Sequence, residues 1–189
     1  MTGDRAVDRA SNLHEDLRRV LTAYRDTDES QLSVREAMLA FLAARPDAAR
    51  RSCVPGHFTA SALVVDPSRR AVLLTLHPRV GRWLQVGGHL EDDPSTVDAA
   101  RREAVEESGI ADLVLDPEPL HLAVHPITCS LGVPTRHLDI RLLAVAPAGA
   151  EPVISAESLD LRWFPHDALP DPLAADLPEL TRRALARLS

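Results

Sequence analysis

The sequence predicts an α/β protein in which helices cover a mixed β-sheet, with a helical hairpin before it. Three observations support this fold class. Apolar residues recur at helical spacing before residue 50 and again over residues 173–188. Short apolar runs bounded by turn residues fill most of the chain after residue 56. One further helical pattern, residues 95–109, lies among those strands, an order typical of a layered sandwich.

Two helices are expected near the N-terminus. Apolar side chains recur at helical spacing over residues 13–24 and again over residues 34–42, and the polar residues 28–30 separate the two patterns. We therefore expect the chain to divide into an N-terminal helical hairpin, residues 1–50, and a main domain, residues 51–189. The hairpin is expected to pack on the main domain. A role in forming a homodimer is the alternative.

The main domain is expected to contain seven strands, a central helix and a closing helix. The strand patterns cover residues 58–65, 71–76, 83–86, 113–115, 120–124, 138–145 and 159–164. The first two form a hairpin around the turn Asp66-Pro67-Ser68-Arg69. Residues 173–188 form the closing helix, in which Pro178 is a possible break.

The central helix has clear end signals. Ser95 and Asp98 have the spacing of a capping box, which places the helix N-terminus at Ser95. Gly109 stands where a left-handed residue commonly ends a helix. The sequence therefore predicts a helix of three to four turns between these two residues.

Three carboxylates share one face of this helix, because Glu103, Glu106 and Glu107 have i, i+3 and i+4 spacing. Like charges so placed repel one another, and a hard cation such as Mg²⁺ or Mn²⁺ removes that cost. The preceding pair Gly87-Gly88 allows a backbone carbonyl to approach the same ion. A charge run alone is usually a solvated helix face, but the glycines favour a metal site suited to phosphate chemistry.

This segment resembles the Nudix box, Gly-x5-Glu-x7-Arg-Glu-U-x-Glu-Glu-x-Gly-U, in which U is a bulky aliphatic residue. The matching positions are Gly88, Arg102, Glu103, Glu106, Glu107, Gly109 and Ile110. Two positions depart from the pattern: Pro94 replaces the first glutamate, and Ala104 replaces a bulky aliphatic residue. The first glutamate usually braces the loop and the box arginine, so either Asp92 or Asp93 would have to replace it.

The resemblance implies an α/β/α sandwich and a metal-dependent hydrolase of a nucleoside diphosphate linked to another moiety. Water attacks phosphorus, and Mg²⁺ or Mn²⁺ is the implied cofactor. Glu106 and Glu107 are the implied metal ligands, together with the carbonyl of Gly87. Glu103 is either a further ligand or the base that orients water, and Arg102 holds the carboxylates in place.

Many members of the family use a further acid from a distant loop. Glu157 is our candidate, because it lies just before a predicted strand and six residues before Trp163. Glu151 is a weaker rival. A solvated loop glutamate with no catalytic role is an equally good interpretation.

Four residues are candidates for substrate contact. His89 follows the glycine pair, and His137 and Asp139 alternate on one strand face, so both side chains can point into a cleft. Trp83 is a candidate for stacking on a base, because the chain has few aromatic residues. The competing interpretation is that these are core or hydrogen-bonded residues.

The chain contains eight histidines, several of them near the predicted site. A zinc site formed by His121, His125 and His137 is an alternative to substrate contact. Histidines that make ordinary hydrogen bonds are the more frequent interpretation.

The composition bounds the class of partner. The net charge of −7 argues against a nucleic-acid backbone and leaves a small nucleotide or diphosphate bound through metal. No apolar run reaches the roughly 18 residues of a membrane span, and the first residues lack a signal-peptide core. A cytoplasmic protein with no membrane partner is therefore expected.

Two other classes of function compete with hydrolysis. Pro94 favours a nucleotide-sensing module with weak or absent catalysis. A diphosphate isomerase on the same scaffold needs a cysteine near the cleft, for which Cys129 is the only plausible residue of the two cysteines. Substrate specificity is expected to depend on the N-terminal hairpin and on residues 126–135.

Overall fold

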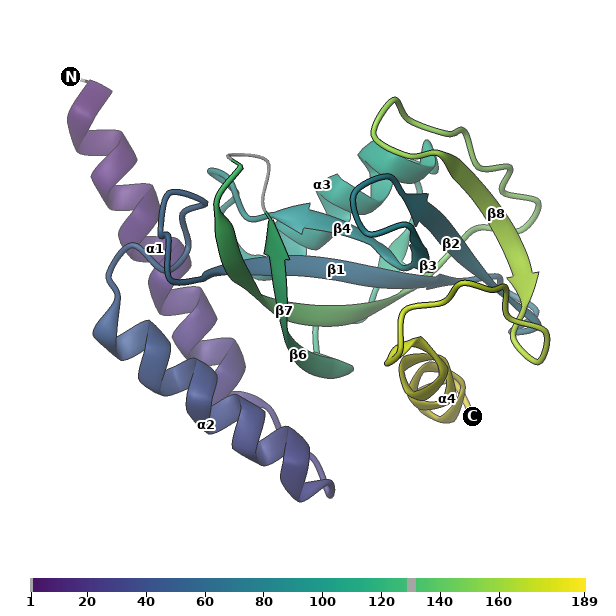
Figure 1. Cartoon of the computed structure of the whole chain (residues 1–189), viewed down its shortest axis with the longest axis horizontal. Coiled ribbons are helices and arrows are strands. Elements are labelled where there is room, and N and C mark those ends of the chain that lie inside the picture. Colours follow the sequence, from purple (N-terminus) through teal and green to yellow (C-terminus); the bar gives the residue numbers. More distant parts are fainter. Residues whose placement is uncertain (1, 129–131) are drawn as a thin grey trace.

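The computed structural model describes residues 2–128 and 132–189. It shows a curled, mixed sheet with helices on both faces (Figure 1). The helices are α1 (Thr2–Ala23), α2 (Glu29–Ala44), α3 (Thr96–Ser108) and α4 (Leu177–Arg187). The strands are β1 (His57–Val65), β2 (Ala71–His77), β3 (Arg82–Leu84), β4 (Val86–His89), β5 (Val114–Leu115), β6 (His121–Thr128), β7 (Pro134–Val145) and β8 (Asp160–Pro165).

Strand β1 is the centre of the sheet. It runs parallel to β7 from the pair His57–His137 to the pair Val65–Val145. Its first half pairs antiparallel with β4, and its end pairs antiparallel with β2. Strands β3 and β8 extend the sheet beyond β2, while β5 and β6 extend it beyond β7. Because β1 exchanges one neighbour for another along its length, the sheet opens at the point where β4 leaves it.

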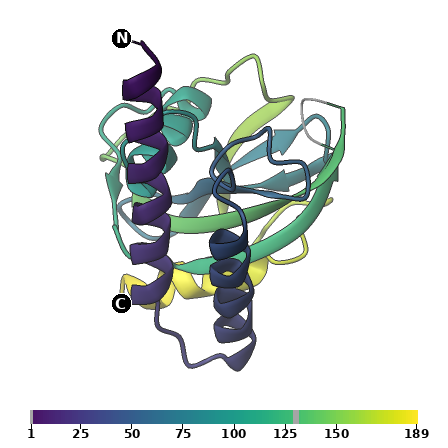
Figure 2. The same cartoon turned by 90° about the vertical axis from the view of Figure 1, so that its left-hand side faces the viewer.

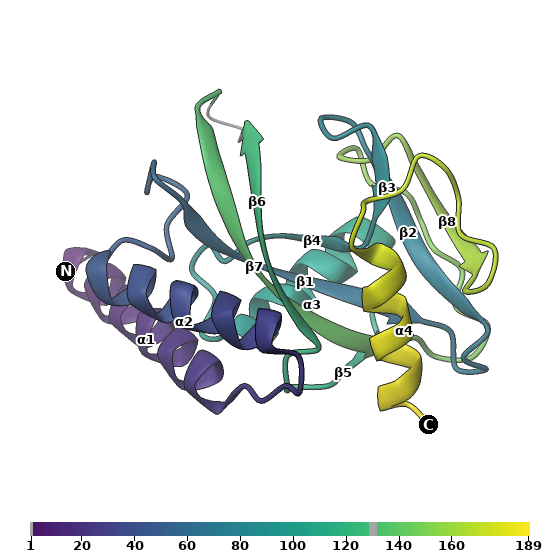
Figure 3. The same cartoon turned by 60° about the horizontal axis from the view of Figure 1, so that its bottom comes forward.

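The two faces of the sheet bury different helices, because successive side chains of a strand point to opposite faces. Ala60 and Ala62 of β1 belong to the same apolar cluster as α3. Leu63 and Val65 belong to a second cluster that includes α4. Figure 3 shows α4 in front of the sheet and α3 behind it. The α/β/α sandwich predicted from the sequence is therefore confirmed.

The N-terminal helices lie side by side as the predicted hairpin (Figure 2). The side chain of Asp28 caps α2 by accepting a hydrogen bond from the backbone N–H of Ser30, at 2.8 Å. Leu17 of α1 and Met38 of α2 are fully buried in the same apolar cluster as α3. The hairpin thus shares its core with the sheet. The division of the chain at residue 50 stays a prediction.

The expected strand 83–86 was wrong in one respect, because it is two strands that pair with different partners. Strand β3 pairs with β2, whereas β4 pairs with β1 through Val86 to His89. The glycine pair is therefore part of a strand and is held in register by backbone hydrogen bonds. Gln85, the residue between the two strands, is buried.

Two other boundaries also differ from the expectation. The closing helix begins at Leu177, so Pro178 lies in its first turn, where a missing N–H costs nothing, and does not break it. In the segment 126–135, the residues up to Thr128 belong to β6 and those from Pro134 belong to β7. Pro126 is tolerated because β6, among the described strands, pairs with β7 alone and is therefore an edge strand. Among the described residues, no helix has the length and apolar character of a membrane span.

Candidate active site

Helix α3 begins and ends as its sequence predicts. The backbone N–H of Asp98 donates to Ser95 Oγ at 3.1 Å, which satisfies one of the free donors at the helix N-terminus. Gly109 ends the helix in the left-handed conformation, with φ of 69°. Ala99, Ala100 and Ala104 are fully buried against the sheet. These small side chains let α3 lie close to the strands, and its carboxylates therefore point toward β4.

The structure brings together the glycine pair and two of the three box carboxylates. Gly87 N–H donates to Glu107 Oε2 at 3.2 Å. A Cβ atom at Gly88 would lie 2.6 Å from the carboxyl group of Glu103, so only glycine fits there without displacing that side chain. Glu103 and Glu107 are 8% and 6% exposed. Glu106 is exposed, which leaves its carboxylate open to solvent and to a ligand.

The electrostatics of these carboxylates favour a bound cation. Burial raises the pKa of Glu107 to about 8, and the charges of Glu103, Glu157 and Glu106 add to the increase. The N–H of Gly87 opposes it. Burial also raises the pKa of Glu103, against the lowering effect of Arg102. Two buried carboxylates therefore resist ionisation until a positive charge compensates them.

Arg102 organises this cluster. Its guanidinium donates to Asp93 Oδ2 at 2.9 Å, to Glu103 Oε1 at 3.0 Å and to Glu106 Oε2 at 2.9 Å. It also donates to the carbonyl oxygen of His89 at 2.8 Å. The carboxylates beside Arg102 raise its pKa despite partial burial, so it stays charged. One side chain thus joins α3, the end of β4 and the loop between them.

Asp93 is the residue that supplies the brace missing at Pro94. Its carboxylate accepts from both Nε and Nη2 of Arg102, at 3.1 and 2.9 Å. The other candidate, Asp92, instead pairs with Arg50 at 2.6 Å. The sequence left this choice open, because the loop path decides which aspartate faces the arginine.

Glu157 lies on the same side of the molecule as the box carboxylates. It is exposed, in the loop before β8, and its charge contributes to the raised pKa of both Glu103 and Glu107. Its own N–H donates to Ser155 Oγ at 3.2 Å, which fixes the local turn. The structure therefore places a fourth carboxylate within electrostatic range of Glu103 and Glu107.

A buried polar network continues from the site along β1 and β7. Thr59 and Ser61 donate their hydroxyls to the two oxygens of Asp139, at 3.0 and 2.8 Å. Arg141 Nε donates to Asp139 Oδ2 at 2.9 Å, and Gln85 reaches the same oxygen at 3.3 Å. Burial would raise the pKa of Asp139, but Arg141 and these donors lower it overall. Asp139 is thus saturated with donors, and it orders neighbouring groups on this face.

Comparison with known proteins identifies the family of this site. A model of the NUDIX domain matches residues 55–185, which is most of the chain. The chain belongs to the Nudix family.

Two curated relatives share part of this Nudix chain. The mouse oxidized purine nucleoside triphosphate hydrolase is 32% identical over 111 residues, which are 57% of this chain and 65% of the relative. The zebrafish m7GpppN-mRNA hydrolase NUDT17 is 38% identical over 77 residues, 37% of this chain and 24% of the relative. The chain therefore spans less than two thirds of the length of each.

Solved Nudix structures resemble this fold over nearly their whole length. A NUDIX-family hydrolase from Clostridium perfringens is 25% identical, with a TM-score of 0.59, over 70% of this chain and 98% of that one. The NUDIX domain of Shewanella oneidensis NrtR, solved with ADP ribose, is 23% identical, with a TM-score of 0.56, over 79% and 97%. The second likeness concerns the fold alone.

The Nudix family generally uses divalent metal ions, and the residues of this chain fit such an ion. Glu103, Glu106 and Glu107 supply oxygen donors of the kind that Mg²⁺ and Mn²⁺ prefer. The cradle at Gly88 leaves room for the Glu103 carboxyl group but none for a Cβ atom. The raised pKa of the buried Glu107 carboxyl is consistent with a site in which a bound cation would stabilise the ionised form.

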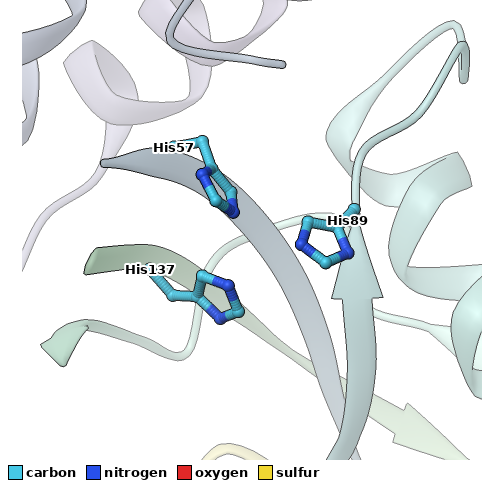
Figure 4. A group of neighbouring side chains, drawn as sticks. All are labelled: His57, His89 and His137. Carbon is cyan, nitrogen blue, oxygen red and sulfur yellow. The ribbon is translucent and has the colours of Figure 1, made fainter. Parts of the chain in front are cut away.

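The histidines gather differently from the zinc alternative proposed from the sequence. His121 pairs in register with Arg141, and its Nε2 lies 3.0 Å from the side-chain nitrogen of Gln31. His137 instead lies beside His57 and His89 (Figure 4). His57 was missed from the sequence, although its alternation with Thr59 and Ser61 places all three on one strand face.

These imidazoles are largely out of water. Burial lowers the pKa of His89 to about 4 and that of His137 to about 3, and the neighbouring histidines add to the effect. Burial likewise lowers the pKa of His57. All three rings are therefore neutral near pH 7, and each retains a nitrogen lone pair.

Trp83 is not brought to the site. It is buried in the apolar cluster that also includes α4, and its ring meets Phe164 edge-on with the centroids 4.8 Å apart. Its backbone N–H donates to Pro172 O, and its carbonyl accepts from Ala174 N–H. The pairing of β3 with β2 places this side chain in the core. Cys129, on which the isomerase alternative depended, lies outside the described residues.

Proposed function

We propose that this chain is a metal-dependent hydrolase that cleaves a diphosphate bond in a nucleoside diphosphate linked to another moiety, or in a similar small diphosphate. The observation that carries the proposal is the complete Arg102 cluster, in which Asp93 replaces the missing box glutamate. The mouse relative, a hydrolase of oxidized purine nucleoside triphosphates, supports a phosphoanhydride as the target.

The box carboxylates would hold the ion, with Mg²⁺ or Mn²⁺ as the proposed metal. Glu106 and Glu107 are the proposed direct ligands, together with the carbonyl of Gly87. When bound, the ion neutralises phosphate oxygens and lowers the pKa of a coordinated water. Glu103 would orient the attacking water or accept its proton, since its carboxyl group lies against Gly88 beside the other box carboxylates.

Two charged residues would assist from nearby. Arg102 would keep Glu103 and Glu106 in position without contacting substrate, because all its donors already serve protein oxygens. Glu157 would supply the further acid, on the support of its electrostatic proximity to Glu103 and Glu107. Charge placement of this kind is the main contribution a protein makes to phosphoryl transfer.

The substrate would lie on the sheet face beside the glycine pair. His89 and His137 line this face, and Asp139 would act indirectly by fixing Ser61 and Arg141. The net charge of −7 supports a small nucleotide bound through metal in preference to a nucleic acid. We also propose a cytoplasmic location from the sequence.

The competing sensing module rested on Pro94, and the Asp93–Arg102 pair removes its main support. A panel of nucleoside diphosphate derivatives and nucleoside triphosphates, assayed with Mg²⁺, Mn²⁺ or chelator, tests the proposal. We expect metal-dependent release of phosphate or nucleotide by the parent. Glu107→Gln should lose turnover, and Glu36→Gln, a matched change on the exposed surface of α2, should retain it. Ligand binding without turnover at saturating metal would establish the sensing module instead.

A further inference from the structure

Three histidines from three different strands meet beside the glycine pair. His57 begins β1 and stands directly opposite His137 of β7. His89 ends β4 opposite Thr59, which is two residues after His57 and therefore on the same face. Figure 4 shows the three rings turned toward a common space. The register of the sheet, and not nearness in sequence, assembles the group.

The ring nitrogens of the three histidines are slightly farther apart than the ligand nitrogens of a zinc site. One ligand nitrogen from each ring can be chosen so that all lie within 4.8 Å of one another. In the described part of the chain, no other group of three or more such side chains is as close. The nitrogens of a tetrahedral zinc site are about 3.3 Å apart, given Zn–N bonds of about 2.0–2.1 Å. Closure therefore requires an inward movement of roughly 1 Å, within the range of side-chain rotation.

We propose that His57, His89 and His137 bind one divalent transition-metal ion of the Zn²⁺ type, at a site separate from the carboxylates of α3. Imidazole nitrogen suits Zn²⁺ and related ions, whereas carboxylate and carbonyl oxygens suit Mg²⁺. The chain thus presents two donor sets of different chemistry next to each other. This inference does not depend on the proposed hydrolase activity.

Hydrogen bonding within the cluster supports this assignment. His137 Nε2 is buried with no hydrogen-bond partner, which is a costly arrangement unless another group occupies the lone pair. His57 Nδ1 lies 3.4 Å from the carbonyl oxygen of Cys53. Metal-bound histidines are commonly oriented in this way, by a backbone carbonyl at the second ring nitrogen.

The surroundings can accommodate a cation and complete its coordination. Arg51, whose positive charge acts on His89, is paired with Glu91, which partly offsets its repulsion of an ion. His125 stands opposite His137 on β6, with the ring centroids 5.6 Å apart, and is a candidate for a fourth position. Zinc sites with three protein ligands otherwise keep that position for water or substrate.

An ion at this site would also stiffen the catalytic loop. His89 directly follows Gly88, and its carbonyl oxygen accepts a hydrogen bond from Arg102 at 2.8 Å. Binding at the His89 ring would therefore tie the end of β4 to β1 and β7, next to the carboxylate cluster.

The test measures zinc binding by the full chain without nucleotide. The protein is stripped of metal, supplied with excess Mg²⁺ to saturate the carboxylates, and titrated with Zn²⁺ against a chromophoric chelator. Co²⁺ replaces Zn²⁺ in a parallel visible-absorption experiment, which reports nitrogen ligation directly. We expect one equivalent of Zn²⁺ and a tetrahedral or five-coordinate Co²⁺ spectrum.

Variants locate the ion. His137→Ala and His89→Gln should each weaken Zn²⁺ binding by at least about tenfold. His166→Ala, a half-buried histidine remote from the cluster, is the matched control and should bind as the parent does. Glu107→Gln should also bind one equivalent of Zn²⁺, because this substitution alters only the carboxylate site. Circular dichroism identifies any variant that fails to fold. Substitution of the half-buried His89 by glutamine is expected to disturb folding less than substitution of His137 by alanine.

Three results would overturn the proposal. The first is that the parent binds no equivalent of Zn²⁺. The second is an unchanged Zn²⁺ affinity in folded His137→Ala and His89→Gln, and the third is loss of Zn²⁺ binding in Glu107→Gln. The last would place the ion on the carboxylates. Mg²⁺-dependent hydrolysis in a protein that binds no Zn²⁺ would leave the proposed function intact while removing this site.

Discussion

Replacing Asp93 by alanine is the sharpest test of how this site is built. Asp93 and Arg102 have side chains that are 13% and 28% exposed, so their pairing is partly screened from solvent. Arg102 Nε and Nη2 both donate to Asp93, at 3.1 and 2.9 Å to the same oxygen. The substitution removes both bonds and leaves two donors of a charged group without their acceptor.

The expected magnitude follows from that geometry. A hydrogen bond to a charged group contributes about 1.5–3 kcal/mol to stability, and the two bonds here share one acceptor group. We therefore expect Asp93→Ala to lower the free energy of unfolding by about 2 kcal/mol. Displacement of Arg102 should also disturb Glu103 and Glu106, and the loss of a residue that orients metal ligands typically costs about 10–100-fold in activity.

Urea unfolding and kcat/KM with Mg²⁺ measure the two effects. Asp92→Ala is the matched control, because Asp92 is exposed and pairs with Arg50 away from the cluster, so its loss should cost less than about 1 kcal/mol. The double variant Asp93→Ala/Pro94→Glu restores an acid at the usual box position and should recover part of the activity. Equal losses in Asp93→Ala and Asp92→Ala would refute the role assigned to Asp93.

Three further predictions concern the glycine cradle, the buried acid and the core. Gly88→Ala should lower kcat/KM more than about tenfold, because the new Cβ displaces the carboxyl end of Glu103. The protein should stay folded, since that end is flexible, and a circular dichroism melting temperature near that of the parent checks this. In chelator, the thermal stability of the parent relative to Glu107→Gln should fall as pH rises from about 4.5 to about 8, because a carboxyl with a raised folded-state pKa favours folding only while protonated. Added Mg²⁺ should restore the parent at high pH, and a difference between the two proteins that does not change with pH would show that Glu107 is not responsible. Trp83→Ala should destabilise the fold by about 3–5 kcal/mol in urea, since it empties a core position, and an unfolding midpoint like the parent's would contradict that placement.

Helix α3 could be predicted from the sequence because interactions between residues close in sequence define it. Ser95, Asp98 and Gly109 act within one turn of the helix ends, and the spacing of Glu103 and Glu107 follows from the helical repeat. The family resemblance rested on the same short segment, and the NUDIX match confirms it. The order of strands and helices was likewise sufficient to predict the α/β/α sandwich, because the spacing of apolar residues in each element reflects which of its faces is buried.

Boundaries were less predictable where neighbouring chains decide them. β3 and β4 separate because they find different partners, β2 and β1, and no signal in residues 83–89 reports that choice. From the sequence, the Trp83 side chain could either stack on a substrate base or be buried in the core. Its contact with Phe164, within the apolar cluster that also includes α4, makes it a core residue.

The sequence by itself determined the family, the helix that carries the carboxylates and the glycines that admit them, because the helix follows from short-range spacing and the family from one continuous segment, Gly88 to Ile110. Only the tertiary structure decided which aspartate braces Arg102 and which histidines meet. Asp93 reaches Arg102 through the path of a loop, and His57, His89 and His137 meet through strand register. Both depend on contacts between distant segments, whose geometry exists only once the sheet has formed.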